Sequence, residues 1–212
     1  MSSLQTKVIF DTWQTATWDE YVQVLGDRKS PKVKHYYRDG QWRIEMVPIG
    51  NDHARDHAVV MLAVSLYATL RGIDFNGMDN CSYRRVGYQE AQPDASYYLA
   101  EQADTVPYGT SIIDLERYAP PNLVIEVAKT SLADDKGDKR ILYEDLGVQE
   151  YWIIDVQNVQ VIAFAMQDGG SKRIIESIVL PGLAIATLNE AFRRTRDMNQ
   201  RLVASWLMEK FQ

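Results

Sequence analysis

The chain has 212 residues, 46% of them hydrophobic, so it can bury a full core, and we expect one domain over residues 1–212 with a helical extension from about residue 188. Its net charge of -6 at pH 7 argues against indiscriminate adhesion to nucleic acid, without excluding a local basic patch. No stretch approaches the roughly 18 apolar residues of a membrane span. The lone Cys81 and a start without an apolar signal core predict a reduced, cytoplasmic protein.

Two helices are predicted in the first third of the chain. Thr17 followed by Glu20 forms a capping-box pattern ahead of a short helix that ends at Gly26. Apolar residues then recur at spacings of three and four, which predicts a long amphipathic helix from about Asp52 to Gly72.

The segment between these helices has the pattern of a loop and a hairpin. The basic stretch 29–34 is typical of a solvated loop. Asp39-Gly40 lies between the aromatic-rich runs 35–37 and 42–46, and this dipeptide is a strong hairpin signal. Two further strands are expected at 81–88 and 94–99, followed by a loop over 105–118. Pro93 suits the start of the second strand, where no ladder hydrogen bond is needed from it.

A short apolar run from Leu123 to Val127 has Glu126 at its centre. A nearly continuous run of this kind is typical of a strand buried on both faces. An ionised carboxylate at that depth is costly unless a cation or hydrogen-bond donors meet it. Glu126 is therefore expected either to be paired or to bind a metal.

The residues after this strand predict a helix and a second strand. Ser131 with Asp134 forms a capping-box pattern, and helical spacing continues until Gly147. Tyr151 to Ile154 is aromatic and β-branched, so we expect a strand parallel to the first, joined to it by a right-handed crossover.

The last third is expected to hold a hairpin, with strands at 159–166 and 172–180, and a helical tail. Thr187 with Glu190 forms a third capping-box pattern. The tail carries one apolar stripe: Leu202, Val203, Trp206, Leu207 and Phe211. Such a stripe needs a cover, which is either its own domain or a second subunit. We expect a homodimer formed through this helix or through an exposed sheet edge.

The residues that can carry chemistry are Asp94, which follows a proline, Glu126, and a lysine further along. Carboxylate oxygens suit Mg²⁺ or Mn²⁺, and Mg²⁺ typically takes only one or two protein carboxylates while keeping water and substrate phosphate. A nearby lysine can position water or stabilise the charge that develops on phosphate. These groups are compatible with phosphodiester hydrolysis.

Pro93-Asp94 followed by Ile125-Glu126-Val127 resembles the PD-(D/E)XK superfamily, the restriction-endonuclease-like fold. From about Thr17 to Leu188, the spacing more specifically resembles a large family of endonuclease-like proteins abundant in photosynthetic bacteria. Further positions carry the resemblance: Glu45-Met46, Pro48, His57, Pro121-Asn122-Leu123-Val124, Thr130-Ser131-Leu132, Asp135, Lys139, Tyr143, Gly147-Val148, Glu150-Tyr151-Trp152 and Asp155.

The resemblance implies an α/β (α+β) nuclease-like domain, a mixed sheet flanked by helices, with Asp94 and Glu126 as metal ligands. The superfamily's usual lysine lies two residues after its second carboxylate, where this chain has Ala128. In the resembled family the lysine has moved to the following helix, which corresponds to Lys139. Lys129 is the rival, and we favour Lys139 because the third residue after Glu126 faces away from it if the strand continues.

Each of these residues also has an ordinary structural interpretation. Asp94 after a proline is often a turn or cap residue, and Glu126 with Lys139 could form a structural ion pair. Lys139 with Asp135 has the spacing of a surface helix pair. Glu45 is either exposed, paired across its hairpin or in a supporting role near the metal.

Three neighbouring side chains complete the candidate set. His53 and His57 have a spacing that can bind zinc, but no glutamate follows His53 as in the metalloprotease motif, and zinc is disfavoured. His57 either contacts substrate or caps the long helix. Tyr143 is expected to pack against the sheet and orient Lys139.

The sequence thus favours a Mg²⁺-dependent or Mn²⁺-dependent DNA endonuclease. A structure-dependent or partner-guided enzyme is favoured over a sequence-selective one by the acidic charge and the lack of an appended DNA-binding motif. The alternative is a catalytically inactive module on the same scaffold that binds nucleic acid or protein. A hydrolase of another phosphoester is a third interpretation.

Overall fold

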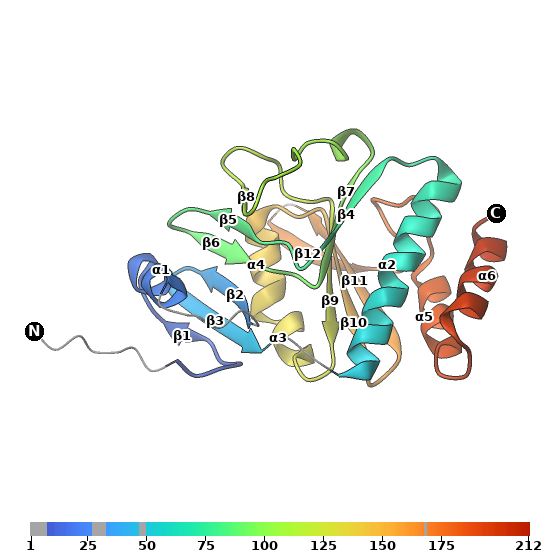
Figure 1. Cartoon of the computed structure of the whole chain (residues 1–212), viewed down its shortest axis with the longest axis horizontal. Helices are drawn as coiled ribbons and strands as arrows, with labels where there is room; N and C mark the ends of the chain where they lie inside the picture. Colours follow the sequence, from blue (N-terminus) through green and yellow to red (C-terminus); the bar gives the residue numbers. More distant parts are fainter. Residues whose placement is uncertain (1–7, 27–32, 47–49, 168) are drawn as a thin grey trace, which may run out of the picture.

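The structure is a computed structural model that describes residues 8–26, 33–46, 50–167 and 169–212. These residues form an α+β fold with two mixed sheets of six strands each (Figure 1). The strand orders are β1-β3-β2-β6-β5-β8 and β12-β11-β10-β9-β7-β4. The predicted class, mixed strands flanked by helices, is confirmed, with the strands divided between two sheets.

The first sheet is built on the predicted hairpin. Its strands are β1 (Gln14–Thr15), β2 (Val33–Arg38), β3 (Gln41–Met46), β5 (Tyr83–Arg85), β6 (Gln89–Ala91) and β8 (Ile113–Asp114). Asp39 and Gly40 join β2 to β3 with φ of 48° and 76°, the left-handed pair that a tight hairpin turn requires. The strand expected over 81–88 is shorter, because the chain turns at Gly87, whose φ is 83°, and returns as β6.

The second sheet holds the predicted central unit. Its strands are β4 (Phe75–Asp79), β7 (Ala95–Leu99), β9 (Leu123–Ala128), β10 (Glu150–Asp155), β11 (Gln160–Gln167) and β12 (Gly170–Ile174). Strands β9 and β10 are parallel, as predicted, and Glu126 lies opposite Ile153.

The predicted strand 172–180 is wrong beyond Ile174. The Glu150 carboxylate accepts backbone N–H groups from Ile178 at 2.7 Å and Val179 at 3.1 Å. These bonds hold the segment as a loop, since the same N–H groups cannot join a sheet ladder.

Helices cover both faces of the second sheet (Figure 1). The helices of the described chain are α1 (Trp18–Gly26), α2 (Asn51–Arg71), α3 (Leu132–Lys136), α4 (Asp138–Leu146), α5 (Ile185–Arg194) and α6 (Gln200–Phe211), with a 3-10 turn at Ala100–Gln102. Of these, α1 packs on the first sheet. In β9, Ile125 and its odd-numbered neighbours pack toward α2 and α5. Val124 and Ala128 pack toward α4 and the first sheet. Glu126 therefore faces α4 and the hairpin, because side chains alternate along a strand.

The three capping-box predictions have different outcomes. Thr17 donates its backbone N–H to Glu20 at 2.8 Å, so the first is confirmed. Ser131 stands at the start of α3, but its hydroxyl donates to Asp135 at 2.6 Å and caps no backbone group. The Thr187 prediction is wrong: α5 already begins at Ile185, which leaves Thr187 inside the helix.

The helix predicted from Ser131 to Gly147 is divided at Gly137. There φ and ψ are -100° and -107°, which ends α3 before α4 begins. A Cβ on residue 137 would lie 3.1 Å from the carbonyl oxygen of Ala133, closer than ordinary contact. Glycine permits the break because it carries no Cβ.

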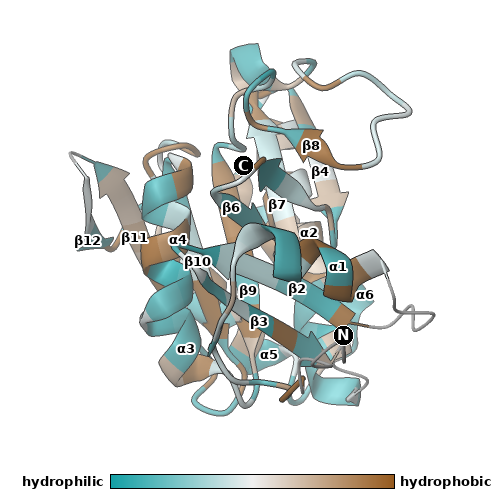
Figure 2. Cartoon of the chain, turned by 90° about the vertical axis from the view of Figure 1, so that its left-hand side faces the viewer, coloured by the Kyte–Doolittle hydropathy of each residue, from teal (hydrophilic) through white to brown (hydrophobic). Residues whose placement is uncertain are grey.

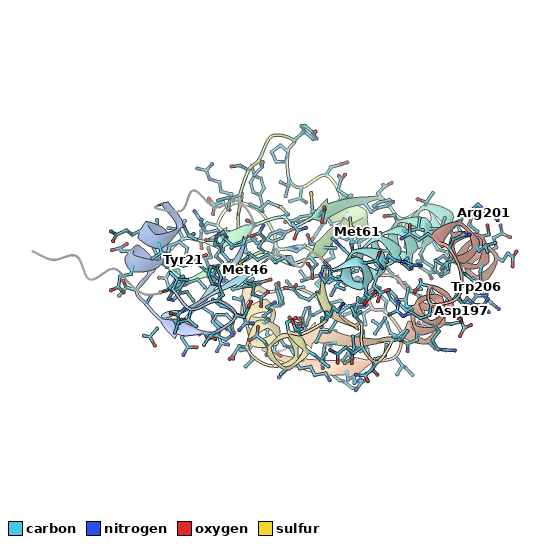
Figure 3. All side chains as sticks on the ribbon, turned by 60° about the horizontal axis from the view of Figure 1, so that its bottom comes forward. Tyr21, Met46, Met61, Asp197, Arg201 and Trp206 are labelled. Atoms are coloured by element: carbon cyan, nitrogen blue, oxygen red, sulfur yellow. The ribbon has the colours of Figure 1, made fainter. Side chains whose placement is uncertain are left out.

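The C-terminal stripe folds back onto its own chain. Val203, Leu207 and Phe211 are buried, and the Phe211 ring packs edge-on against Tyr67 with 4.9 Å between centroids. The outer part of the stripe is less covered, since Leu202 is 40% exposed. Figure 3 places Trp206, on α6, far from Tyr21, which lies toward the other end of the molecule. Among the described residues, no helix is long and apolar enough to cross a membrane.

Candidate active site

The candidate active site lies between the two sheets. Figure 2 shows the hairpin of β2 and β3 in front of β9 and β10. Across this hairpin Lys34 is opposite Glu45, and Tyr36 is opposite Arg43, so the four side chains share one face. The facing wall contributes three buried residues: Asp94, Glu126 and Lys139.

Asp94 stands just before β7, where both of its carboxylate oxygens are engaged. Oδ2 accepts the backbone N–H of Val127 at 2.7 Å, which ties Asp94 to the neighbouring strand. Oδ1 lies 2.5 Å from Lys34 Nζ. Burial alone would raise the pKa of Asp94, but Lys34 and His53 outweigh burial and hold that pKa well below its usual range. Asp94 is therefore an ionised carboxylate.

Glu126 is met by hydroxyl donors on one side and by ammonium groups on both. Its Oε1 accepts the hydroxyls of Tyr143 at 2.7 Å and Tyr36 at 3.0 Å. Lys139 Nζ lies 3.7 Å from Oε1, and Lys34 Nζ lies 3.5 Å from Oε2. Burial raises the pKa of Glu126 to about 7, against the opposing pull of the two lysines. The expectation that burial demands partners for this residue agrees with these contacts.

Lys139 projects from the first turn of α4 into the same cluster. Its Nζ lies 2.9 Å from Glu45 Oε2 and 3.0 Å from Asp135 Oδ1. Burial would lower the pKa of Lys139, but Asp135, Glu126 and Glu45 raise it well above its usual range. The exposed surface pair considered for Lys139 and Asp135 is wrong, because both side chains are almost completely buried.

The other predicted residues divide between this cluster and its surroundings. Glu45 belongs to it and also accepts from Arg43 at 2.7 Å. Lys129 lies outside, on the surface, where it pairs with Asp52 at 3.0 Å. This placement separates the two rival lysines: only Lys139 of the pair contacts Glu126.

The two histidines of α2 have separate neighbours. His53 Nε2 lies 3.4 Å from Asp94 Oδ2, whereas His57 Nε2 lies 3.5 Å from Asp79 Oδ1. Burial lowers the pKa of His57. His53 therefore stands nearer to the carboxylate pair than the residue that sequence reasoning selected.

Sequence reasoning missed Lys34, which is 2% exposed inside the cluster. Its basic neighbours suggested a solvated loop, and residues 29–32 of that stretch lie outside the described part of the chain. The available signal was alternation: Lys34 lies two residues before Tyr36, so the two share a strand face. Tyr36 and Asp135 were likewise not assigned to the site.

The site offers two carboxylate ligands to a hard divalent cation. In the described chain, no three His, Cys, Asp or Glu side chains form a group that could hold a metal by themselves. Mg²⁺ does not need three, because it keeps several waters and binds through one or two carboxylates. Asp94 Oδ1 and Glu126 Oε2 are two carboxylate oxygens turned toward one point, at which Lys34 Nζ now lies.

Residues 18–199 match the model of the Uma2 family, which is described as "Putative restriction endonuclease". The chain belongs to the Uma2 family. The expected membership of an endonuclease-like family is thereby confirmed. No curated protein matches the sequence significantly.

A solved structure shares the fold of this Uma2 family member. It is described as a putative nuclease belonging to DUF820 from Anabaena variabilis ATCC 29413. The two chains are 19% identical with a TM-score of 0.54, and the match covers 90% of this chain and 98% of that one. At this identity the likeness concerns the fold.

Proposed function

We propose that this Uma2 family protein is a metal-dependent endonuclease that hydrolyses DNA phosphodiester bonds. One observation carries the proposal: two buried carboxylates, Asp94 and Glu126, each turn one oxygen toward a common point, and a buried lysine, Lys139, lies 3.7 Å from the other oxygen of Glu126. Burying several charges together is costly and is seldom justified by stability alone. Perturbed, converging carboxylates are more typical of functional sites.

In this proposal Asp94 and Glu126 would hold Mg²⁺ or Mn²⁺. When bound, such an ion lowers the pKa of attacking water and neutralises charge on the phosphate. The chain's own residues orient the two ligands. Val127 N–H fixes Asp94 through Oδ2, and the hydroxyls of Tyr36 and Tyr143 fix Glu126 through Oε1, which leaves Oδ1 and Oε2 for the ion.

Lys139 would act on the phosphate. Glu45 and Asp135 hold its ammonium within 3.0 Å, so its position is set before substrate arrives. A preorganised positive charge stabilises the negative charge that develops on phosphate during attack. Because Asp94, Glu126 and Lys139 are nearly inaccessible, with 3%, 2% and 1% exposed, the hairpin that covers them must shift to admit DNA.

The second candidate function is a module on the same scaffold that binds nucleic acid or protein without cleaving. The specific observation in its favour is Lys34, which already occupies the point where the two carboxylates converge. A protein whose carboxylates serve only this lysine would bind no Mn²⁺, so the absence of Mn²⁺ binding would favour this second function.

Cleavage by lysine variants tests the proposed enzyme. Lys139→Met keeps much of the aliphatic stem and should reduce Mg²⁺-dependent or Mn²⁺-dependent cleavage of supercoiled and single-stranded DNA by about a hundredfold or more. Lys129→Met is the matched control, and it should cleave like wild type because Lys129 pairs with Asp52 on the surface. Urea unfolding of both variants separates lost chemistry from lost folding.

Two results would contradict this assignment. Full activity in Lys139→Met together with an inactive Lys129→Met would move the lysine's role to Lys129. Wild-type protein that binds Mn²⁺ but cleaves no DNA would favour the binding module.

Homodimerisation and a cytoplasmic location stay proposals. The inner half of the C-terminal stripe is covered by its own chain, so it needs no partner. Surfaces that remain for a dimer include the outer half of α6, with Leu202 and Met208 exposed, and the edge strands of the second sheet, β4 and β12.

A further inference from the structure

Lys34 fills the space between the two carboxylates of the site. It lies in β2 and is 2% exposed. Its Nζ is 2.5 Å from Asp94 Oδ1 and 3.5 Å from Glu126 Oε2. A single ammonium thus contacts both acids, which is the place a divalent cation held by them would take.

The other two carboxylate oxygens are already engaged elsewhere. Asp94 Oδ2 accepts from Val127 N–H, and Glu126 Oε1 accepts from two tyrosine hydroxyls. Lys139 also approaches Glu126 on the Oε1 side, at 3.7 Å. The oxygens left for a metal are therefore the same two that contact Lys34.

The hairpin fixes Lys34 in this position. Lys34 is opposite Glu45 in the β2–β3 register, and Glu45 is bound to Lys139 at 2.9 Å. Tyr36, on the same face of β2, donates its hydroxyl to Glu126, and that hydroxyl oxygen also lies 3.0 Å from the carbonyl oxygen of Gln92. Lys34 is thus held by a strand with several contacts to the site, unlike a surface lysine on a free side chain.

A divalent cation and this ammonium cannot both occupy the point where Oδ1 and Oε2 converge. They would compete for the same two oxygens and repel each other across a short distance in a buried, weakly screened environment. Metal binding must then be accompanied by movement of Lys34 Nζ away from at least one carboxylate.

We propose that Lys34 is a built-in competitor of the metal, whose ammonium holds the cation position in the metal-free protein and is displaced when a divalent ion binds. Lys34 thereby sets the metal affinity of the site. Since Lys34 and Tyr36 belong to one strand, the displacement also links metal binding to the position of the hairpin that covers the site. The inference rests on the proposed metal-dependent function.

Titration calorimetry with Mn²⁺ on full-length protein at pH 8 tests this inference. Lys34→Met and Lys34→Gln remove the competing charge, and each should bind Mn²⁺ more tightly than wild type by roughly tenfold or more. Lys34→Arg keeps a cation at the position and should bind no more tightly than wild type. Lys129→Met also removes a lysine paired with a carboxylate, but on the surface, and its affinity should equal that of wild type.

Thermal unfolding with and without Mn²⁺ gives a second readout, and the neutral variants should gain more stability from Mn²⁺ than wild type does. If a neutral variant does not fold, the other one and Lys34→Arg still decide the matter. The competitor role is overturned if wild type binds Mn²⁺ and the neutral variants bind it no more tightly, or if Lys34→Arg binds it more tightly than wild type. Either result leaves the metal site intact. Absence of Mn²⁺ binding in wild type and in every Lys34 variant overturns the proposed function as well.

Discussion

The contacts of Glu126 and its burial have opposite effects on its protonation state. Two tyrosine hydroxyls donate to it and two ammonium groups lie within 4 Å, all of which favour the carboxylate. Removal from water favours the neutral acid, and burial outweighs the rest, so the pKa rises to about 7. Asp94 shows the reverse balance, because Lys34 and His53 outweigh burial and keep its pKa low.

The raised pKa of Glu126 predicts a pH-dependent cost in the metal-free protein. Between pH 4.5, the usual pKa, and about 7, the folded protein holds a proton that the unfolded chain has released. Raising the pH through this window therefore lowers the free energy of unfolding, by on the order of 3 kcal/mol. Glu126→Gln should lose this dependence and be at least as stable as wild type at pH 8. Urea unfolding with a chelator at both ends of the window measures it.

Glu45→Gln is the matched control, with the opposite sign. Burial would raise the pKa of Glu45, but Lys139 and Arg43 outweigh it and lower that pKa. Its stabilising contribution is present above the usual value and is lost as the pH falls through the lowered pKa. Glu45→Gln should thus cost most at high pH. An identical pH trend in both variants would contradict these assignments.

Residue types that need a partner were the easiest to predict from the sequence. Glu126 stood out because an acid inside an apolar strand must be compensated, and Lys139 followed from the family resemblance. Lys34 could not be recognised from composition, since a lysine beside other basic residues is usually solvated. Its burial depends on a hairpin that meets the second sheet far away in the chain, and no local pattern reports that contact.

Elements that end at a clear turn or helix-terminating residue were predicted with good boundaries. Asp39-Gly40 placed the hairpin turn, and Gly72, whose φ is 65°, ended the long helix α2. The break at Gly137 was missed because a lone glycine inside a helical pattern is usually tolerated. The failure at residues 175–180 has a different cause: the backbone N–H groups there bind Glu150, which lies on another strand.

Helix α6 belongs to the hydrophobic core through its inner face, which yields a stability prediction. Phe211 is 2% exposed and packs on Tyr67, so Phe211→Ala should lower the free energy of unfolding by about 3–5 kcal/mol. Met208 lies on the same helix but is 44% exposed, and Met208→Ala should cost less than about 1 kcal/mol. Urea unfolding of both variants compares the two faces. Equal losses would mean that α6 is not anchored through Phe211.

The contacts between distant segments of the chain are the part of the fold that the sequence alone did not predict. The parallel pair of β9 and β10 followed from a strand-helix-strand pattern, which is local. The division of the strands into two sheets, with the site between them, depends on contacts between distant segments, such as the 94 positions that separate Glu45 from Lys139.

The oligomeric state is a prediction for the whole molecule. If the outer face of α6 forms a homodimer, sedimentation velocity should show a dimer at high micromolar concentration, and Leu202→Glu should shift it to monomer by placing a charge in the apolar contact. A wild-type monomer at that concentration would rule the dimer out. A dimer that survives Leu202→Glu would point to a sheet edge, such as β4 or β12.

The distances in sequence between contacting residues of the site predict an order of folding. Glu126 and Tyr143 are only 17 positions apart within one strand-helix-strand unit, so they meet by closing a short loop, whereas the contact between Glu45 and Lys139 closes a much longer one. We expect the compact unit to form early, with Glu126 still open to water. Docking of the hairpin would then remove that water, so proton uptake by Glu126 would accompany the late, slow step of folding.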